Sequence, residues 1–354
     1  MFPFNELKQI HVEITSRCQA SCPMCSRNHH GGLDNPKLKL ADWSLNDFKT
    51  IFDSTVLNQI SSVYFCGNFG DPIINNDLLD MCRHIKDPVE VRIHTNGSAR
   101  NIQWWKDLAT SLPSKHVVVF GIDGLEDTHH LYRVGTNFKN ILANAKAFID
   151  AGGTAEWVFI KFKHNEHQVE EAKQLASEIG FQRFSVKNSI RFLTGDKFEV
   201  LDKQGQVLYH LEPPSENKIT FIDRNLVNKV DDWLQTVEID CYVKQNKEVY
   251  IDAHKNLFPC CFIGATPYNY SSPDSIMSPL RDRALREYDQ LVSELGELDT
   301  TQRHIKDIID SEVWQTIWEQ YWEEKKLLVC AKTCGKADFS KPKDQIIERV
   351  HLNE

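Results

Sequence analysis

The sequence lacks the features that would place the protein in a membrane or outside the cell. No apolar run approaches the ~18 residues that a helix needs to cross a bilayer. The N-terminal stretch MFPFNELKQIHVEIT has no basic segment followed by an apolar one, so it does not have the pattern of a secretory signal peptide. We therefore expect a cytoplasmic protein with no membrane partner.

Positive charge is also scarce, because 41 Lys and Arg residues face 50 Asp and Glu residues and the formal net charge is −9. Binding to nucleic acid usually needs a concentrated basic face, so this balance argues against a nucleic-acid partner. No internal repeat or low-complexity tract is present. The 41% of hydrophobic and 26% of charged residues are typical of a globular protein.

Short runs rich in β-branched and aromatic residues alternate with segments of helical length in the first half. The predicted strands are 11–15, 62–65, 91–95, 116–122, 156–162 and 184–188. The predicted helices are 44–56, 77–85, 102–112, 138–151 and 166–179. Such alternation predicts a parallel sheet with right-handed crossovers. A complete eight-unit barrel typically needs ~250 residues. Because the run ends near residue 195, we expect an α/β fold with an open, six-stranded partial (β/α)6 barrel.

The regular alternation of predicted strands and helices ends in the second half of the chain. Residues 197–211 predict a hairpin around Gly205, and a second hairpin is predicted within 241–263. A Trp-rich amphipathic helix over 312–326 leads into Cys330. We expect a barrel domain over 1–200 and a smaller α+β domain over 201–354.

Ten cysteines need an explanation in a chain that is neither short nor visibly secreted. Grouped cysteines in a reducing compartment more often bind metal or do redox chemistry than form disulfides. Eight of the ten fall into two groups: Cys18, Cys22, Cys25, and Cys241, Cys260, Cys261, Cys330, Cys334. Cys66 and Cys82 stand apart, and we interpret them as packing residues.

The first group follows the first predicted strand as Cys18-Gln-Ala-Ser-Cys22-Pro-Met-Cys25. Three thiolates on one loop can bind three corners of a 4Fe–4S cluster, which normally takes four. The fourth iron is then open and can act as a reagent. The residues alone leave zinc as an alternative, with His29 or His30 completing the set.

The C-x3-C-x2-C spacing and the surrounding ITSRCQASCPMCSRN resemble the radical S-adenosylmethionine (SAM) superfamily. The resemblance implies a partial barrel and a cluster chelated by the amino and carboxylate groups of SAM. It also implies reductive cleavage of SAM to methionine and a 5′-deoxyadenosyl radical, which abstracts hydrogen from a substrate. Cys18, Cys22 and Cys25 would be the catalytic cluster ligands. Met24 occupies the position where the family often has an aromatic residue.

Further family positions follow the later strands, where ligands of parallel sheets bind. The segment Cys66–Pro72 resembles the family's GGEP motif, with Phe69 and Asp71 as departures, and other positions follow the third and fourth predicted strands. By this resemblance the SAM-binding residues would be Gly70, Asp71, Pro72, Thr95, Asn96, Asp123 and Arg133. Without it, these segments would be ordinary turns and Arg133 a solvated arginine.

The second cysteine group resembles the auxiliary-cluster region of the SPASM and twitch subgroups of this superfamily. A cysteine precedes a hairpin, another ends it, and a helix brings the last two. The implied ligands of a second 4Fe–4S cluster are Cys241, Cys260, Cys330 and Cys334. Cys261 could replace Cys260, and a four-thiolate zinc site is the alternative reading of the residues.

The same resemblance implies a peptide substrate, because family members of this architecture mostly modify ribosomally made peptides by crosslinking, epimerisation or backbone excision. It also implies an electron donor such as flavodoxin or ferredoxin, and a separate leader-binding protein for a precursor peptide. A small-molecule dehydrogenase or mutase is the first alternative. The second is a non-catalytic iron–sulfur electron-transfer protein.

Overall fold

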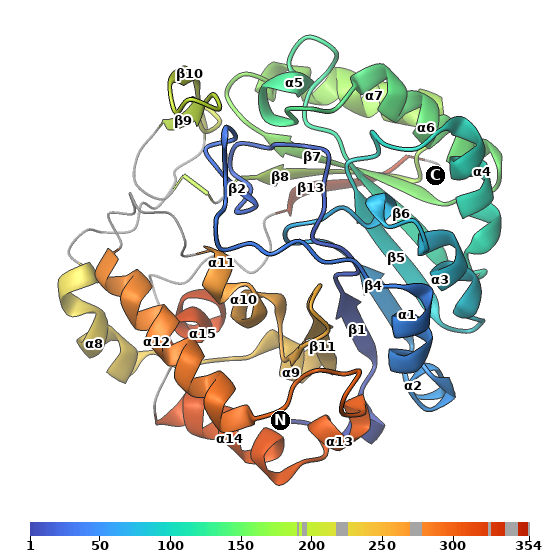
Figure 1. Cartoon of the computed structure of the whole chain (residues 1–354). Helices are drawn as coiled ribbons and strands as arrows, with labels where there is room; N and C mark the ends of the chain where they lie inside the picture. The colour runs from blue at the N-terminus through green and yellow to red at the C-terminus, as the bar shows by residue number, and fades with distance from the viewer. Residues whose placement is uncertain are drawn as a thin grey trace.

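A large, mostly parallel sheet organises the computed structural model (Figure 1), which describes residues 1–189, 191–192, 197–216, 226–269, 278–324, 327–336 and 346–352. The six parallel strands are β1 (Gln9–Val12), β4 (Ser62–Phe65), β5 (Glu90–Thr95), β6 (His116–Gly121), β7 (Ala155–Lys161) and β8 (Arg183–Asn188). They are hydrogen-bonded in that order, each in parallel to the next. The predicted six-stranded partial barrel is therefore confirmed.

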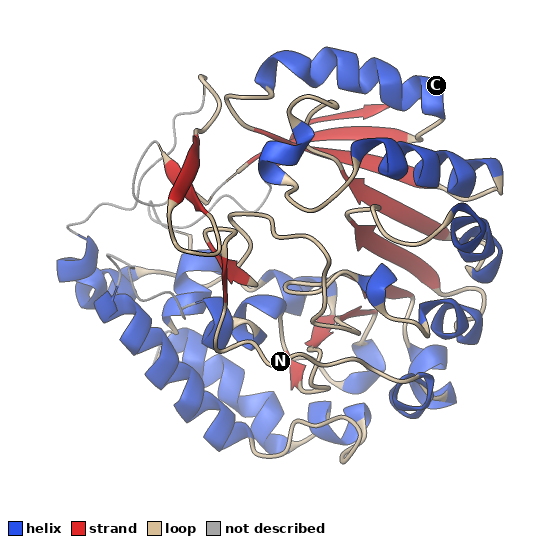
Figure 2. Cartoon of the chain, turned by 45° about the horizontal axis from the view of Figure 1, so that its top comes forward, coloured by secondary structure: helices blue, strands red, loops and turns tan. Residues whose placement is uncertain are grey.

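Helices cover the outer face of these strands (Figure 2). They are α1 (Leu45–Ile51), α2 (Ser54–Gln59), α3 (Leu78–His84), α4 (Ile102–Ser111), α5 (His129–Tyr132), α6 (Phe138–Asp150) and α7 (Val169–Ile179). Short 3-10 turns η1 (Phe4–Glu6), η2 (Pro72–Ile74) and η3 (Glu166–Gln168) complete this part. The predicted helix 44–56 is two helices, because the first ends at Ile51 and Asp53 caps the start of the second by accepting a hydrogen bond from Val56 N.

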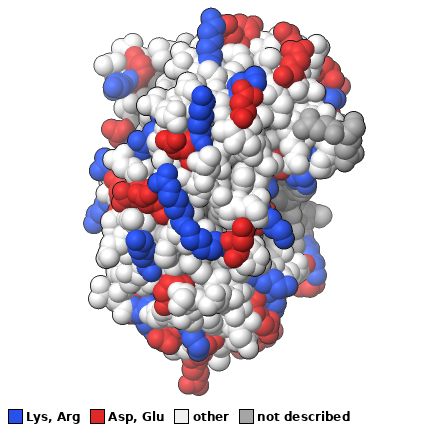
Figure 3. All heavy atoms as spheres, turned by 90° about the vertical axis from the view of Figure 1, so that its right-hand side faces the viewer, with Lys and Arg blue, Asp and Glu red and all other residues white. Residues whose placement is uncertain are grey.

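Apolar and polar residues alternate along the strands, so that one face of the sheet packs in the core and the other face is polar. In β5, Val91 and Ile93 are fully buried, whereas Arg92 and His94, which alternate with them, are partly exposed on the other face. Trp105, Phe120 and Phe148 fill the layer between strands and helices. On the outer side Lys and Arg are interspersed with Asp and Glu (Figure 3), as expected for solvated helix faces.

Two hairpins follow the barrel strands, as predicted. One consists of β9 (Phe198–Leu201) and β10 (Val207–Leu211), which pair antiparallel around Gly205 at φ +79°. The other consists of β11 (Glu248–Ile251) and β12 (Leu257–Phe258). Strand β11 also pairs in parallel with β1, so this hairpin extends the barrel sheet. A last strand, β13 (Ile346–His351), pairs antiparallel with β8 and ends the sheet on the other side.

The remaining elements belong to the second half of the chain and to the loop after β1. The helices are α8 (Leu226–Thr236), α9 (Tyr242–Asn246), α10 (Cys261–Gly264), α11 (Thr266–Asn269), α12 (Ser278–Leu295), α13 (Ile305–Ile309), α14 (Glu312–Glu323) and α15 (Leu328–Cys334). A small hairpin of β2 (Asn28–His29) and β3 (Leu33–Asp34) lies in the loop after β1. Helix α14 confirms most of the predicted Trp-rich helix, whose last two residues lie outside the described ranges. The domain boundary near residue 200 stays a prediction.

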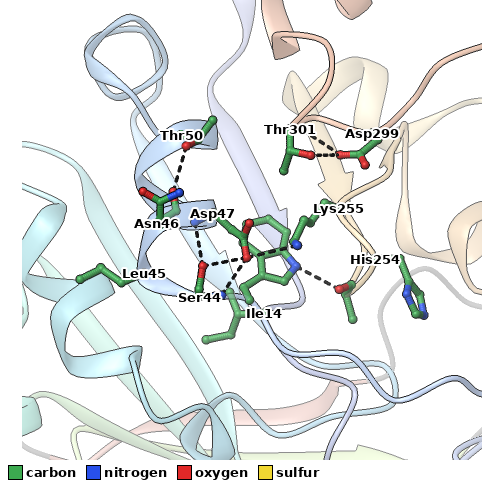
Figure 4. A network of polar contacts seen from close by, with 12 residues as sticks. Ile14, Ser44, Leu45, Asn46, Asp47, Thr50, His254, Lys255, Asp299 and Thr301 are labelled. Atoms are coloured by element: carbon green, nitrogen blue, oxygen red, sulfur yellow. Dashed lines mark hydrogen bonds and ion pairs between the residues drawn. The ribbon is translucent and has the colours of Figure 1, made fainter.

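The start of α1 ties the barrel to the β11–β12 hairpin (Figure 4). Ser44 and Asp47 form a reciprocal capping box. The Asp47 carboxylate also pairs with Lys255 Nζ at 3.1 Å, in the turn between β11 and β12. Trp43 Nε1 donates to Ala253 O at 3.2 Å nearby. Within the described ranges, no helix is long and apolar enough to cross a membrane.

Candidate functional site

The loop between β1 and α1 carries the first three cysteines at the carboxyl edge of the parallel strands. Cys18, Cys22 and Cys25 are free thiols and partly exposed. The guanidinium of Arg27 donates to the backbone oxygens of Ser16 and Phe69, which holds this loop against the loop after β4. The β9–β10 hairpin lies against the other side of the loop (Figure 1), because Leu201 N donates to His30 O at 2.9 Å.

The three thiols lie close enough to one another to interact electrostatically. Burial raises the pKa of Cys22 to about 11, nearby Cys25 raises it further, and Arg133 opposes the rise. Burial also raises the pKa of Cys18, with contributions from Cys22 and Cys25. Deprotonated thiols repel one another here, and iron would remove that repulsion by binding them.

The donor set fits a 4Fe–4S cluster that leaves one iron without a protein ligand. Within the described ranges, no three His, Cys, Asp or Glu side chains converge on a position for one metal ion. Cluster thiolates bind different irons and need no common point. His30, a candidate zinc ligand, instead stacks on Phe198 at 4.6 Å and hydrogen-bonds Glu199 O through Nδ1.

Asp71 links the end of β5 to the cysteine loop. Its buried carboxylate accepts from Thr95 Oγ1 at 2.8 Å and from Asn96 N and Nδ2 at 2.7 and 2.6 Å. The same Asn96 Nδ2 lies 3.6 Å from the Cys18 sulfur, and Gln19 Nε2 donates to Asn96 Oδ1 at 2.6 Å. Burial raises the pKa of Asp71, and these hydrogen bonds oppose that rise. The structure thus brings together three of the residues predicted to bind SAM beside one predicted cluster ligand.

Gly70 and Pro72, the neighbours of Asp71, determine the backbone conformation of this loop. A Cβ on Gly70 would lie 1.9 Å from Thr15 O, so only glycine fits between the two loops. Pro72 is buried and starts the turn η2, where Asp71 caps Ile73 N. Contact of Gly70, Asp71 or Pro72 with SAM stays a prediction.

Asp123 and Arg133 form the other polar pair at this edge. Arg133 Nε donates to Asp123 Oδ2 at 2.6 Å, and Ile160 N donates to Asp123 Oδ1 at 2.6 Å. The Asp123 side chain is fully buried, whereas 18% of the Arg133 side chain is exposed. Arg133 also lies near Cys22, and it lowers the pKa of that thiol by its charge and by a hydrogen bond. The predicted contact of Asp123 with the SAM ribose is untested, while its contact with Arg133 is direct.

Glu13 is a residue of this site that the sequence reading missed. Its fully buried carboxylate accepts from Phe69 N at 2.8 Å and Gly70 N at 3.0 Å, and from the Tyr250 hydroxyl at 2.7 Å. Asn68 Nδ2 donates to the same hydroxyl at 3.1 Å. Burial raises the pKa of Glu13 to about 7 against these donors. The sequence does carry a signal for Glu13, because an acidic residue within a strand predicted to be buried is almost never left without a partner.

The polar face of the barrel lies below these loops. Glu156 bridges Arg92 at 2.7 Å and Arg183 at 2.9 Å across β5, β7 and β8. Burial and the neighbouring cations Arg92 and Lys187 hold the pKa of His94 well below its usual value. This face therefore carries partly exposed polar and cationic side chains rather than an apolar filling.

Four of the five C-terminal cysteines meet in one cavity. Cys241 begins α9, Cys260 begins α10, and Cys330 and Cys334 lie one turn apart on α15. The cavity is lined by all four, together with apolar side chains that include Val243, Ile263 and Trp322. A hydrogen bond with Cys334 and then burial raise the pKa of the Cys241 thiol. Three buried thiols and the partly exposed Cys241 around an apolar cavity fit an iron–sulfur cluster, whose irons each take their own thiolate.

Cys261 lies elsewhere. It is not among the residues that line the cavity, and it interacts electrostatically with Cys66 at the end of β4. At the start of α10 the two neighbouring thiols therefore have different surroundings: Cys260 lines the cavity, and Cys261 lies towards the barrel. Cys82 is fully buried on α3, consistent with packing.

Comparison with known proteins gives partial matches in sequence. No family model matches the chain. It is 28% identical over 142 residues to a tungsten-containing aldehyde ferredoxin oxidoreductase cofactor-modifying protein of Pyrococcus furiosus, covering 40% of this chain and 36% of that protein. It is 25% identical over 145 residues to a 7,8-dihydro-6-hydroxymethylpterin dimethyltransferase of Methanocaldococcus jannaschii, covering 38% and 27%. The chain thus matches 36% of the length of the first relative and 27% of the second.

Solved structures match over most of the chain. Streptococcus suis SuiB bound to S-adenosylmethionine gives a TM-score of 0.52 at 14% identity, covering 89% of this chain and 68% of SuiB. The enzyme anSMEcpe with bound AdoMet gives 0.52 at 13% identity, covering 96% and 89%. At these identities the likeness concerns the fold. The chain therefore has the fold of the radical SAM enzymes, as the resemblance of its N-terminal cysteine motif to that superfamily predicts.

Proposed function

We propose that this protein is a radical SAM enzyme with two 4Fe–4S clusters. The observation that carries the proposal is the contact of two predicted cluster ligands with two polar pairs at the same sheet edge. Cys18 lies beside Asn96, which Asp71 holds, and Cys22 lies beside Arg133, which Asp123 holds. A plain structural metal site would need neither pair.

In this proposal Cys18, Cys22 and Cys25 hold the first cluster. When bound, that cluster and SAM supply the reductive cleavage that yields a 5′-deoxyadenosyl radical. Asp71 fixes Thr95 and Asn96, so the polar groups beside Cys18 are set before SAM arrives. The short side chain of Asp71 is fully used by this task. SAM would therefore contact the groups that Asp71 orients, Thr95 and Asn96, rather than Asp71 itself.

Arg133 is suited to receive the SAM carboxylate. It is cationic, partly exposed and adjacent to Cys22, and Asp123 holds it through Nε, which leaves the other guanidinium edge free of that bond. Asp123 then acts as a positioning residue. The fully buried carboxylate also ties Arg133 to β7 through Ile160 N.

The second cluster would be held by Cys241, Cys260, Cys330 and Cys334. These residues come from α9, α10 and α15, so a bound cluster would tie together segments that lie far apart in the chain. Its apolar cavity would keep water from the irons.

A ribosomally made peptide is the proposed substrate, modified by crosslinking, epimerisation or backbone excision. In support, the similar structures include SuiB bound to the precursor peptide SuiA and anSMEcpe bound to AdoMet and the Cp18Cys peptide. A separate leader-binding protein and a flavodoxin or ferredoxin as electron donor complete the proposal. The second candidate, a small-molecule substrate, draws on the two sequence relatives, whose names describe a cofactor-modifying protein and a pterin dimethyltransferase.

Mass spectrometry distinguishes these candidates. Reconstituted, reduced protein is incubated with SAM and either synthetic peptides encoded beside its gene or a metabolite extract. We expect 5′-deoxyadenosine together with a peptide whose mass has changed, and loss of both with an Arg133→Met variant. A mass change confined to a small molecule would replace the peptide proposal, and absence of 5′-deoxyadenosine under all conditions would contradict radical SAM chemistry.

A further inference from the structure

The side-chain amide of Asn96, directly after β5, is held in one orientation by its neighbours. Its oxygen Oδ1 accepts from Gln19 Nε2 at 2.6 Å and from Ser98 N at 3.0 Å. Its nitrogen Nδ2 donates to Asp71 Oδ2 at 2.6 Å, and the backbone N of Asn96 donates to the same oxygen at 2.7 Å. Two donors at one end of the amide and a carboxylate at the other determine which end is the nitrogen.

The same amide nitrogen also donates to the Cys18 sulfur, at a distance of 3.6 Å. An amide NH2 group has two hydrogens, so Nδ2 can serve the Asp71 carboxylate and the Cys18 sulfur at once. Ala20 N donates to this sulfur as well, at 3.4 Å. A neutral thiol is a weak acceptor, whereas a metal-bound thiolate accepts more strongly, so binding of iron would strengthen both hydrogen bonds.

Asn96 therefore lies between two groups that would both be negatively charged when a cluster is bound. Asp71 is 4% exposed and Asn96 is 5% exposed, so water screens this contact poorly. Acceptance of two hydrogen bonds by Oδ1 polarises the amide and strengthens donation from Nδ2. Gln19 and Asp71 are thus positioning residues for a donor to the Cys18 sulfur.

We propose that Asn96 raises the reduction potential of the SAM-binding cluster by donating its side-chain N–H to the Cys18 sulfur. The inference rests on the proposed first 4Fe–4S cluster. Reduction adds one electron, taken from the flavodoxin or ferredoxin, and breaks no bond to the protein. A donor to a ligand sulfur stabilises the negative charge that the cluster gains. Asn96 thereby favours delivery of the electron that SAM cleavage needs.

The test is a redox titration of the reconstituted full-length protein without SAM, followed by electron paramagnetic resonance. The SAM-binding cluster is identified as the one whose signal changes when SAM is then added. Asn96→Leu keeps a side chain of similar branched shape and removes the donor. We expect all iron to be retained and the equilibrium constant for one-electron reduction of this cluster to fall about tenfold, a shift of 59 mV to more negative potential.

Asn144→Leu is the matched control, because Asn144 is another buried asparagine that holds the same loop. Its Nδ2 donates to the backbone oxygens of Gly97 at 2.9 Å and Ala99 at 3.4 Å, and the residue is 3% exposed. The cluster potential of this variant should equal that of the wild type. An equal shift in both variants would assign the effect to distortion of the loop and overturn the inference.

A second measurement does not depend on the folding of any variant. A crystal structure of the unmutated, reconstituted protein should keep Asn96 Nδ2 within hydrogen-bond distance of the Cys18 sulfur, as it is here at 3.6 Å. An amide turned away from this sulfur, or retained iron with an unchanged potential in Asn96→Leu, would overturn the inference and leave the proposed function standing. Zinc in place of a cluster at the N-terminal cysteines would overturn both together.

Discussion

Tyr250 donates its hydroxyl hydrogen to Glu13 Oε2 at 2.7 Å, and this bond joins the β11 strand to the loop that precedes Asp71. Glu13 holds Phe69 N and Gly70 N through its other oxygen. One buried carboxylate therefore connects a strand of the C-terminal half to the proposed SAM pocket.

Tyr250→Phe should weaken SAM binding without loss of either cluster. The variant removes a hydrogen bond to a buried carboxylate and leaves Asn68 without its acceptor, at a cost of about 1.5–3 kcal/mol. Part of that cost should appear as lower stability and part as a severalfold higher Kd for SAM, measured by calorimetry on reconstituted protein. Tyr288→Phe, on α12 and away from Glu13, is the control. Equal SAM affinity in the wild type and Tyr250→Phe would show that the link does not reach the pocket.

Glu13 should make stability depend on pH. Its folded pKa of about 7 lies above the ordinary value of 4.5, so the folded protein retains a proton that the unfolded chain loses. The stabilisation is complete below pH 4.5 and is lost as the pH rises through 7, by up to about 3 kcal/mol. Glu13→Gln should flatten this part of the profile in urea unfolding between pH 5 and 8. Glu248, with a folded pKa of about 7, contributes the same sign in both proteins and cancels in the difference. Parallel profiles would contradict the assignment.

Asp71→Ala should retain both clusters and lose SAM affinity. The substitution leaves Asn96 N and Nδ2 without their acceptor and frees the side chain beside Cys18. We expect a severalfold higher Kd for SAM, because Thr95 and Asn96 are no longer oriented, and a stability loss of roughly 1.5–3 kcal/mol, typical of a lost charge-assisted hydrogen bond. Asp80→Ala removes an exposed carboxylate on α3 and serves as the control. Unchanged SAM affinity in Asp71→Ala would mean that the pocket lies over other loops.

The auxiliary site should be dispensable for SAM cleavage and necessary for turnover. Cys330→Ala/Cys334→Ala protein is expected to lose about four irons, to retain 5′-deoxyadenosine formation, and to release no oxidised product. Cys261→Ala should keep all iron, because Cys261 lies outside the cavity. Iron analysis and product assays check both variants. Full turnover in protein without the second cluster would refute its role.

The sequence predicted the strands and the cysteine groups because both depend on local pattern. Alternation of apolar residues marks buried strands, and close spacing marks ligands on one loop. The pairing of β11 with β1 was not predictable in this way, since it joins Tyr250 to His11 across more than two hundred residues. The capping box of Ser44 and Asp47 is likewise a local feature, whereas the ion pair of Asp47 with Lys255 joins residues far apart in the sequence.

The same distinction between local pattern and long-range contact applies to the candidate site. Asp71, Asn96 and Arg133 follow strand ends and could be named, but their partners could not. Spacing does not reveal that Asp123 is fully buried and paired with Arg133. The choice between Cys260 and Cys261 likewise depends on the direction in which α10 begins.

Iron content and SAM cleavage in the Cys18→Ala/Cys22→Ala/Cys25→Ala variant test the central claim most directly. Anaerobically reconstituted wild-type protein should contain about eight irons and the variant about four, because a cubane is lost with its thiolate anchors. The wild type should form 5′-deoxyadenosine under reducing conditions, and the variant should form none. Unchanged SAM cleavage by the variant, or zinc in place of iron at the N-terminal site of the wild type, would contradict the account.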